Sequence, residues 1–147
     1  MKQELLNKCF DYVEERIKSA ESAITSAKEA SQDDTKSSAG DKYETTREMM
    51  QQEISRNEAQ LHEAMKLKHA LLQISISKTS KVVENGSIVL TENGNFFISI
   101  SGGQTTVEGM TFFMISSASP LGRLLLGLKK GKKVDFKGKT FEVKEIY

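Results

Sequence analysis

Residues 6–27 read LNKCFDYVEERIKSAESAITSA, and this stretch decides the fold of the first half of the chain. Its apolar residues recur at alternating intervals of four and three. That is the spacing of a helix that buries one side against a partner helix. The stretch therefore predicts a long helix whose buried stripe consists of Leu6, Phe10, Val13, Ile17, Ala20, Ile24 and Ala27.

The partner is expected to be the next helical segment, because residues 31–40 read SQDDTKSSAG, a polar and turn-prone run. A second helix is predicted from about Thr45 to Ile76, with a less regular apolar stripe. If the chain folds back near residue 39, four apolar pairs share one register. The pairs are Ile24 with Ile54, Ile17 with Leu61, Val13 with Met65, and Leu6 with Leu72, and the stripe also includes Met50 and Ile76.

The second half of the chain has a different composition. Residues 79–147 hold the only proline and every glycine except Gly40, among many Val, Ile, Phe and Thr residues. This composition is typical of strands and turns. We expect a hairpin of strands 87–91 and 96–101, a long β-prone run within 105–116, and a last hairpin of strands 133–136 and 140–146. A helix is expected over 121–128, ending near Gly127 or Gly131, with Ser119 as its N-cap and Pro120 at its first position.

The predicted fold class is therefore α+β. Residues 1–78 form an antiparallel coiled-coil hairpin with an acidic tip near 31–46, and residues 79–147 form a small strand-rich domain with one helix. No apolar run approaches the ~20 residues that a bilayer span needs, and the charged N-terminus is unlike a secretory signal. The single cysteine, Cys9, rules out a disulfide framework and suits a reducing compartment.

Two acidic residues at the start of the second helix are the first candidates for chemistry. Asp41 and Glu44 lie three residues apart, which aims both carboxylates toward one point beyond the tip. Oxygen ligands of this kind suit Mg²⁺. The same spacing is also that of a capping box, with Asp41 as N-cap and Glu44 at the third helical position. Both interpretations stay open at this point.

A basic cluster is the second candidate. It comprises Lys129, Lys130, Lys132 and Lys133, and it either forms a solvated turn or contacts phosphate, most plausibly on nucleic acid. The balance of 21 basic and 20 acidic residues gives no reason to expect a general nucleic-acid coat. Cys9 is interpreted as a buried thiol, and His62 and His69 are too far apart to share one tetrahedral metal site.

Residues 119–127 read SPLGRLLLG, and residues 141–147 read FEVKEIY. The first stretch resembles the S-P-x-[AG]-x-x-L-[IL]-G helix, and the second the terminal strand, of the bacterial Gre transcript-cleavage factor family (GreA/GreB). At the tip, AGDKYE at 39–44 is similar to the family's A-x-x-G-D-x-x-E-N. The resemblance spans nearly the whole chain and implies an FKBP-like C-terminal domain.

The resemblance also implies a function. The hairpin would enter the secondary channel of RNA polymerase, where Asp41 and Glu44 would help to hold a second Mg²⁺ and promote cleavage of backtracked RNA. The chain would then be a cytoplasmic, monomeric elongation factor and not itself an enzyme, with no tightly bound cofactor and no membrane. Its partners would be RNA polymerase and the 3′ end of the nascent RNA, with Lys129, Lys130, Lys132, Lys133 and Arg123 as polymerase or nucleic-acid contacts.

The tip departs from the family pattern in ways that bear on cleavage more than on binding. Thr45 stands where the family has Asn, Lys42 where it has an apolar residue, and Arg47 could neutralise one carboxylate. A polymerase binder that only blocks the channel is therefore an alternative. Two further alternatives are a prolyl isomerase, which would need an aromatic-walled pocket, and a structural coiled-coil adaptor, which would not need the acidic pair.

Overall fold

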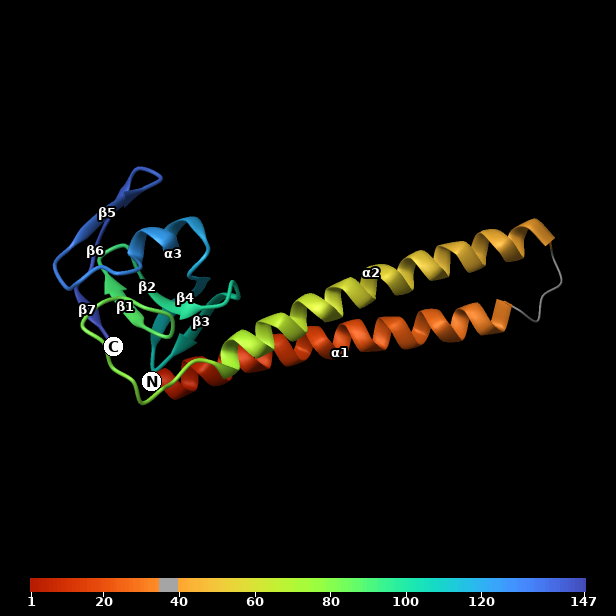
Figure 1. Ribbon diagram of the computed structural model, residues 1–147, viewed down its shortest axis with the longest axis horizontal. Helices are drawn as coiled ribbons and strands as arrows, with labels where there is room; N and C mark the ends of the chain where they lie inside the picture. The colour runs from red at the N-terminus through yellow and green to blue at the C-terminus, as the bar shows by residue number, and fades with distance from the viewer. Residues whose placement is uncertain (35–39) are drawn as a thin grey trace. The chain divides into compact units, whose positions relative to one another are not determined.

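The structure is a computed structural model that describes the backbone of residues 1–34 and 40–147 and the side chains of residues 1–32 and 44–147. Two long helices come first, α1 (Lys2–Asp34) and α2 (Gly40–Leu72) (Figure 1). A strand-rich region with one short helix follows. Its elements are β1 (Ile88–Thr91), β2 (Gly94–Ser99), β3 (Gly103–Val107), β4 (Met110–Ser116), α3 (Pro120–Leu125), β5 (Lys133–Phe136), β6 (Lys139–Glu142) and β7 (Glu145–Ile146). The predicted α+β class, a helical hairpin followed by a small sheet domain, is confirmed.

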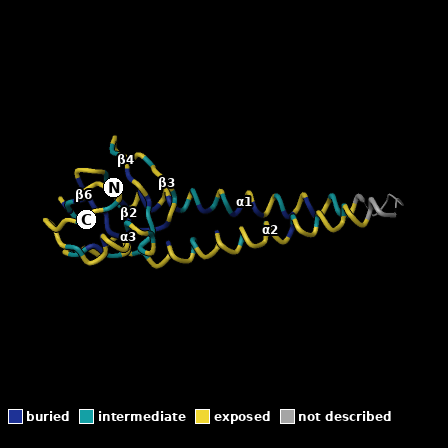
Figure 2. The backbone as a smooth tube through the Cα atoms, turned by 90° about the horizontal axis from the view of Figure 1, so that it is seen from above, coloured by how far each residue is buried: buried dark blue, intermediate teal, exposed yellow. Residues whose placement is uncertain are grey.

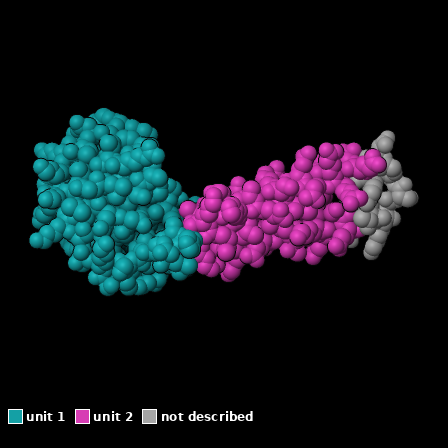
Figure 3. Space-filling view, viewed as in Figure 1, with its two compact units in different colours: residues 1–12, 69–147 teal, residues 13–68 magenta. Residues whose placement is uncertain are grey.

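The chain divides into two compact units (Figure 3). One unit consists of residues 13–68, the greater part of the helical hairpin, in which α1 and α2 run antiparallel (Figure 1). The other consists of residues 1–12 together with residues 69–147. The first turns of α1 and the last residues of α2 thus belong to the same unit as the sheet, whereas the composition of the sequence changes near residue 78.

The predicted buried stripe of α1 is confirmed. Six of its seven residues are buried, from Leu6 to Ala27, and Phe10 is half-buried. Ile24 and Ala27 form one apolar cluster with Ile54 of α2, as the predicted pairing of Ile24 with Ile54 requires. From Val13 onward the buried residues of α1 recur at the heptad spacing (Figure 2), whereas Leu5 and Cys9 are also buried near its start.

The predicted stripe of α2 is wrong in its second half. Met65 and Leu72 are 49% and 62% exposed, and the buried residues are instead their neighbours Ala64 and Leu71, both 0% exposed. Ile76 lies beyond the end of the helix and is also exposed. The predicted pairs of Val13 with Met65 and Leu6 with Leu72 therefore do not form a buried seam.

Two polar residues conceal the true heptad pattern of α2. The half-buried or buried positions follow one regular spacing through Met50, Ile54, Asn57, Leu61, Ala64, Lys68 and Leu71. Asn57 turns its side-chain amide back to the carbonyl oxygen of Glu53, at 2.9 Å. The Lys68 ammonium lies 2.7 Å from the carboxylate of Glu14 on α1. Polar residues at such positions fix the register of paired helices at some cost in stability.

Two neighbouring leucines test the corrected register. We expect Leu71→Ala to lower the free energy of unfolding by about 2–4 kcal/mol, because it removes a fully buried side chain and leaves a cavity. Leu72→Ala should change it by less than about 0.5 kcal/mol, because that side chain is exposed. Urea unfolding of both variants gives the comparison, and a larger loss for Leu72→Ala than for Leu71→Ala would contradict the register.

The main sheet has five strands in the order β3-β4-β2-β1-β7. The predicted hairpin of residues 87–101 is confirmed, with β1 antiparallel to β2 and Thr91 paired with Gly94. Strand β4 lies parallel to β2, and β3 pairs with β4 at the edge. Strands β5 and β6 form a separate two-stranded hairpin.

Three predicted elements of this region need correction. The run 105–116 is not one strand, because Glu108 and Gly109 adopt positive φ angles and form the tight turn between β3 and β4. The helix ends at Leu125, short of residue 128, and Gly127 follows with a φ of 80°. The last predicted strand, 140–146, divides into β6 and β7, and β7 leaves the hairpin to pair with β1.

The start of α3 is as predicted. Ser119 is the N-cap, its hydroxyl oxygen accepts the amide hydrogen of Gly122 at 3.1 Å, and Pro120 occupies the first helical position. The same hydroxyl donates to the carbonyl oxygen of Ser116 at 2.7 Å. Gly122 is required here, because a Cβ atom would lie 2.0 Å from that carbonyl oxygen. The cap thus ties the helix directly to the end of β4.

The sheet buries both faces. On one face Phe96 and Ile98 pack in an apolar core with Leu125 of α3 and Phe141 of β6. On the opposite face, Ser99 and Met114 meet Cys9 from the first turns of α1. Alternate residues of β2 and β4 therefore serve different cores, which explains their unbroken apolar runs.

Candidate functional site

The predicted acidic tip lies at the N-terminus of α2. The helix begins at Gly40, one residue before the predicted N-cap, so Asp41 and Glu44 both belong to its first turns. Glu44 is exposed, whereas the side chain of Asp41 lies outside the described residues, as does most of the polar run 33–43. The positive end of the helix dipole favours carboxylates at these positions.

The arrangement suits the delivery of carboxylates to another molecule. Residues three apart on a helix share one face, and Glu44 faces solvent. Arg47, the residue expected to compete for a carboxylate, is exposed and makes no ion pair with any side chain that the structure describes. A pair of carboxylates on one helix binds Mg²⁺ weakly by itself, since the ion otherwise keeps its water ligands.

The predicted basic cluster lies on the turn between α3 and β5. Its four lysines are exposed, and Arg123 is an exposed residue of α3. Lys130 pairs with Glu145 at 2.6 Å, and Lys133 lies 4.0 Å from Glu142. The turn itself is held by backbone bonds, from the amide of Gly131 to the carbonyl oxygen of Val143 at 2.7 Å and from Lys132 to Lys129 at 3.1 Å. The lysines therefore extend from a well-ordered backbone.

An aromatic-walled hollow of about 350 Å³ lies beside this region. Phe96 is 5.8 Å from both Phe113 and Phe141, measured between ring centroids, and Phe136 completes the wall. The ammonium group of Lys137 lies 5.3 Å from the ring centroid of Phe136. Phe97 and Phe112, the strand neighbours of Phe96 and Phe113, are fully buried and do not line the hollow.

Part of this hollow can be derived from the predicted hairpin of residues 133–146, which carries Phe136 and Phe141. Strands β5 and β6 pair Val134 with Phe141, which places Phe136 and Phe141 on the same face of the hairpin. The hairpin then folds over the face of the sheet that carries Phe96 and Phe113. Only the packing of the hairpin onto the sheet, which the sequence does not state, brings the four rings together.

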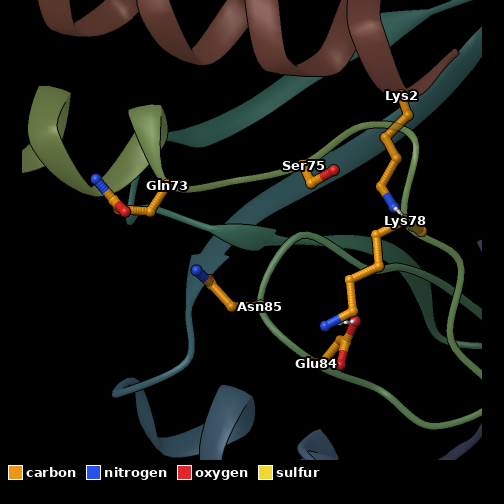
Figure 4. Close-up of a pocket in the computed structure, with 6 residues that line it drawn as sticks. All are labelled: Lys2, Gln73, Ser75, Lys78, Glu84 and Asn85. Atoms are coloured by element: carbon orange, nitrogen blue, oxygen red, sulfur yellow. Dashed lines mark hydrogen bonds and ion pairs between the residues drawn. The ribbon is translucent and has the colours of Figure 1, made fainter.

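A smaller polar pocket of about 230 Å³ lies where α1 begins (Figure 4). It is lined by Lys2, Gln73, Ser75, Lys78, Glu84 and Asn85, and Lys78 and Glu84 lie next to each other (Figure 4). The Lys2 ammonium donates to the carbonyl oxygen of Lys78 at 3.2 Å, and Lys78 pairs with Glu84 at 3.4 Å. Burial lowers the pKa of Lys2, and the charge of Glu84 opposes that shift. These groups satisfy one another and tie the start of α1 to the chain that follows α2.

Cys9 is fully buried, as predicted. Its Sγ atom lies 3.2 Å from the Sδ atom of Met114 and 3.5 Å from the hydroxyl of Ser99. His62 and His69 are both exposed. Within the part of the chain that the structure describes, no three His, Cys, Asp or Glu side chains converge as metal ligands would.

No protein-family model matches the chain, and no curated protein matches it. Among the described residues, no helix combines the length and the apolar character needed to cross a membrane.

The buried thiol predicts a pH dependence of stability. Burial raises the pKa of Cys9 above its ordinary value of 9.0, and the hydrogen bond with Ser99 opposes this shift. Because the folded state favours the protonated thiol, its contribution is complete below pH 9 and is lost as the pH rises through the folded-state pKa.

Urea unfolding between pH 8 and pH 10.5 measures this effect. The parent protein should lose more stability over that range than Cys9→Ala, which carries no thiol. Parallel curves for the two proteins would show that the thiol titrates alike in the folded and unfolded chains.

Proposed function

We propose that this chain is an RNA polymerase-binding elongation factor of the Gre type. In this proposal the helical hairpin enters the secondary channel as a coiled coil, and the carboxylates of Asp41 and Glu44 promote cleavage of backtracked RNA. The observation that carries the proposal is the position of these two acids in the first turns of α2, where the hairpin reverses. Each helix has 33 residues, a length of about 50 Å at 1.5 Å per residue.

The chemistry assigned to the two acids is that of ligands lent to another active centre. A second Mg²⁺ in two-metal phosphoryl transfer stabilises the attacking and leaving oxygens. Asp41 and Glu44 would supply two of its oxygen ligands, and carboxylates of the polymerase and a phosphate of the RNA would supply others. The chain is then not itself an enzyme, and the metal is shared with the polymerase.

Features of the strand-rich unit support the same proposal. The resemblance to the Gre family rests on the Ser119-Pro120 helix and the terminal strand, and in this chain Ser119 caps α3 and β7 closes the edge of the sheet. An FKBP-like domain of this kind would bind the polymerase outside the channel. The proposal includes a monomeric protein of the bacterial cytoplasm, since polymerase is found there.

Neutral replacements at the tip test the role of the carboxylates. Asp41→Asn and Glu44→Gln each remove a charge needed to hold Mg²⁺ and keep nearly the same size, so we expect each to reduce RNA cleavage by stalled polymerase at least about tenfold. Thermal stability should change little, since both positions lie in the first turns of a helix. The measurement is release of short 3′ RNA fragments from backtracked complexes at saturating protein.

Glu48→Gln is the matched control, because Glu48 is also exposed on α2 and lies one turn further from its start. This variant should stimulate RNA cleavage by the polymerase as much as the parent protein does. Equal cleavage by all four proteins would remove the metal role of Asp41 and Glu44.

The alternative function, a factor that occupies the channel without stimulating cleavage, gives a different pattern in the same assay. Such a protein would bind polymerase and slow nucleotide entry, and its tip variants would behave like the parent. The aromatic-walled hollow is the one observation that favours a prolyl isomerase instead. Isomerase activity would also be independent of residues 41 and 44, so the tip variants separate the proposed function from both alternatives.

A further inference from the structure

Three lysines from separate parts of the chain line one hollow of about 370 Å³. Lys81 comes from the segment before β1, and Lys129 and Lys130 come from the turn after α3. Glu145 and Ile146 of β7 complete the wall together with Ser80. We call this the basic hollow. It unites residues of the predicted basic cluster with Lys81, which the sequence places far from them.

Backbone pairing holds the two lysine-bearing segments together. Val82 forms an antiparallel bridge with Lys129, and the amide of Val83 donates to the carbonyl oxygen of Leu128 at 2.9 Å. Val83 itself is buried in the apolar core of the sheet. Backbone pairing, and not an interaction between the lysine side chains, therefore places the lysines around one hollow. The fold brings their positive charges together against their mutual repulsion.

The charges in the basic hollow are not balanced. Glu145 pairs with Lys130 at 2.6 Å, which leaves Lys81 and Lys129 without an ion-pair partner among the residues that the structure describes. The hydroxyl oxygen of Ser80 accepts the amide hydrogen of Val82 at 3.3 Å, so its own hydrogen remains available for donation. Like charges that line one hollow repel each other, and an anion bound there would be attracted to both.

The basic cluster therefore divides into two parts. Lys129 and Lys130 line the basic hollow, whereas Lys132 and Lys133 do not. Lys133 instead lies near Glu142 on the β5–β6 hairpin. Lys132 and Lys133 therefore give a control of equal charge for changes to two lysines of the basic hollow.

We propose that the basic hollow binds a phosphate-bearing ligand of the nucleotide class. Lys81 and Lys129 would neutralise the phosphate oxygens, Ser80 would donate a hydrogen bond to one of them, and Ile146 offers an apolar wall for the sugar or base. Lysine is a common point-charge partner of phosphate. Free nucleotides and an RNA chain share this chemistry. The proposal goes beyond the function of the hairpin and does not depend on it.

Titration of the 147-residue chain without polymerase tests the proposal. The probes are pyrophosphate, ATP and a short single-stranded RNA without a terminal phosphate, each followed by calorimetry and by amide chemical shifts at low salt. We expect binding that weakens as salt is added. Lys81→Ala combined with Lys129→Ala should weaken the tightest probe at least about tenfold, and the control Lys132→Ala with Lys133→Ala should change it less than about twofold.

A variant expected to bind phosphate more tightly provides a second test. Glu145→Gln removes the only carboxylate among the described residues that line the basic hollow and frees Lys130, so it should tighten phosphate binding several-fold. The backbone pairing of residue 145 with Leu90 of β1 does not involve the carboxylate. Thermal melts would verify that each variant is folded.

The outcomes are decisive in both directions. Tightest binding of ATP identifies a free nucleotide as the ligand, and tightest binding of RNA identifies the nucleic-acid backbone. Equal losses in the two double variants would show a diffuse surface charge and overturn the proposal. Absence of binding to all three probes at millimolar concentration would overturn it as well.

Discussion

The buried seam between α1 and α2 is the interaction on which the helical hairpin, and with it the position of Asp41 and Glu44, depends. A two-helix hairpin has no deep core, so a single row of side chains must supply most of the energy that keeps the helices paired. Val13, Ile17 and Ile24 on α1 are buried along that row, and Ile54 and Ala64 are buried on α2. Pairing along this row brings the start of α2 back to the end of α1, and so presents Asp41 and Glu44 where the hairpin reverses.

The sequence predicted the parts of the fold that local patterns determine. Every position of the α1 stripe is apolar, so its spacing alone identified the buried side, and Ser119-Pro120 marked the start of α3 because both residues act locally. The second half of the α2 stripe was missed because Asn57 and Lys68 are polar residues at seam positions, so the apolar residues alone do not reveal the spacing. The turn at Glu108 was missed because a positive φ at glutamate has no signature in a run of β-formers.

The candidate sites also differ in whether neighbouring residues or distant segments form them. The acidic pair could be named because its two members are neighbours in the sequence, whereas the hollows depend on contacts between distant segments. Lys81 joins Lys129 only through the bridge at Val82, and Phe141 meets Phe96 only because the β5–β6 hairpin folds onto the sheet. Such pairings follow from tertiary packing, which composition and periodicity do not specify.

The most direct test of the central claim is transcript cleavage by bacterial RNA polymerase in backtracked complexes, measured with and without the unaltered protein. If the hairpin delivers two carboxylates to the polymerase active centre, the protein should accelerate Mg²⁺-dependent release of 3′ RNA fragments at least about tenfold. An unchanged or slower rate, under conditions in which the protein demonstrably binds the polymerase, would contradict the account.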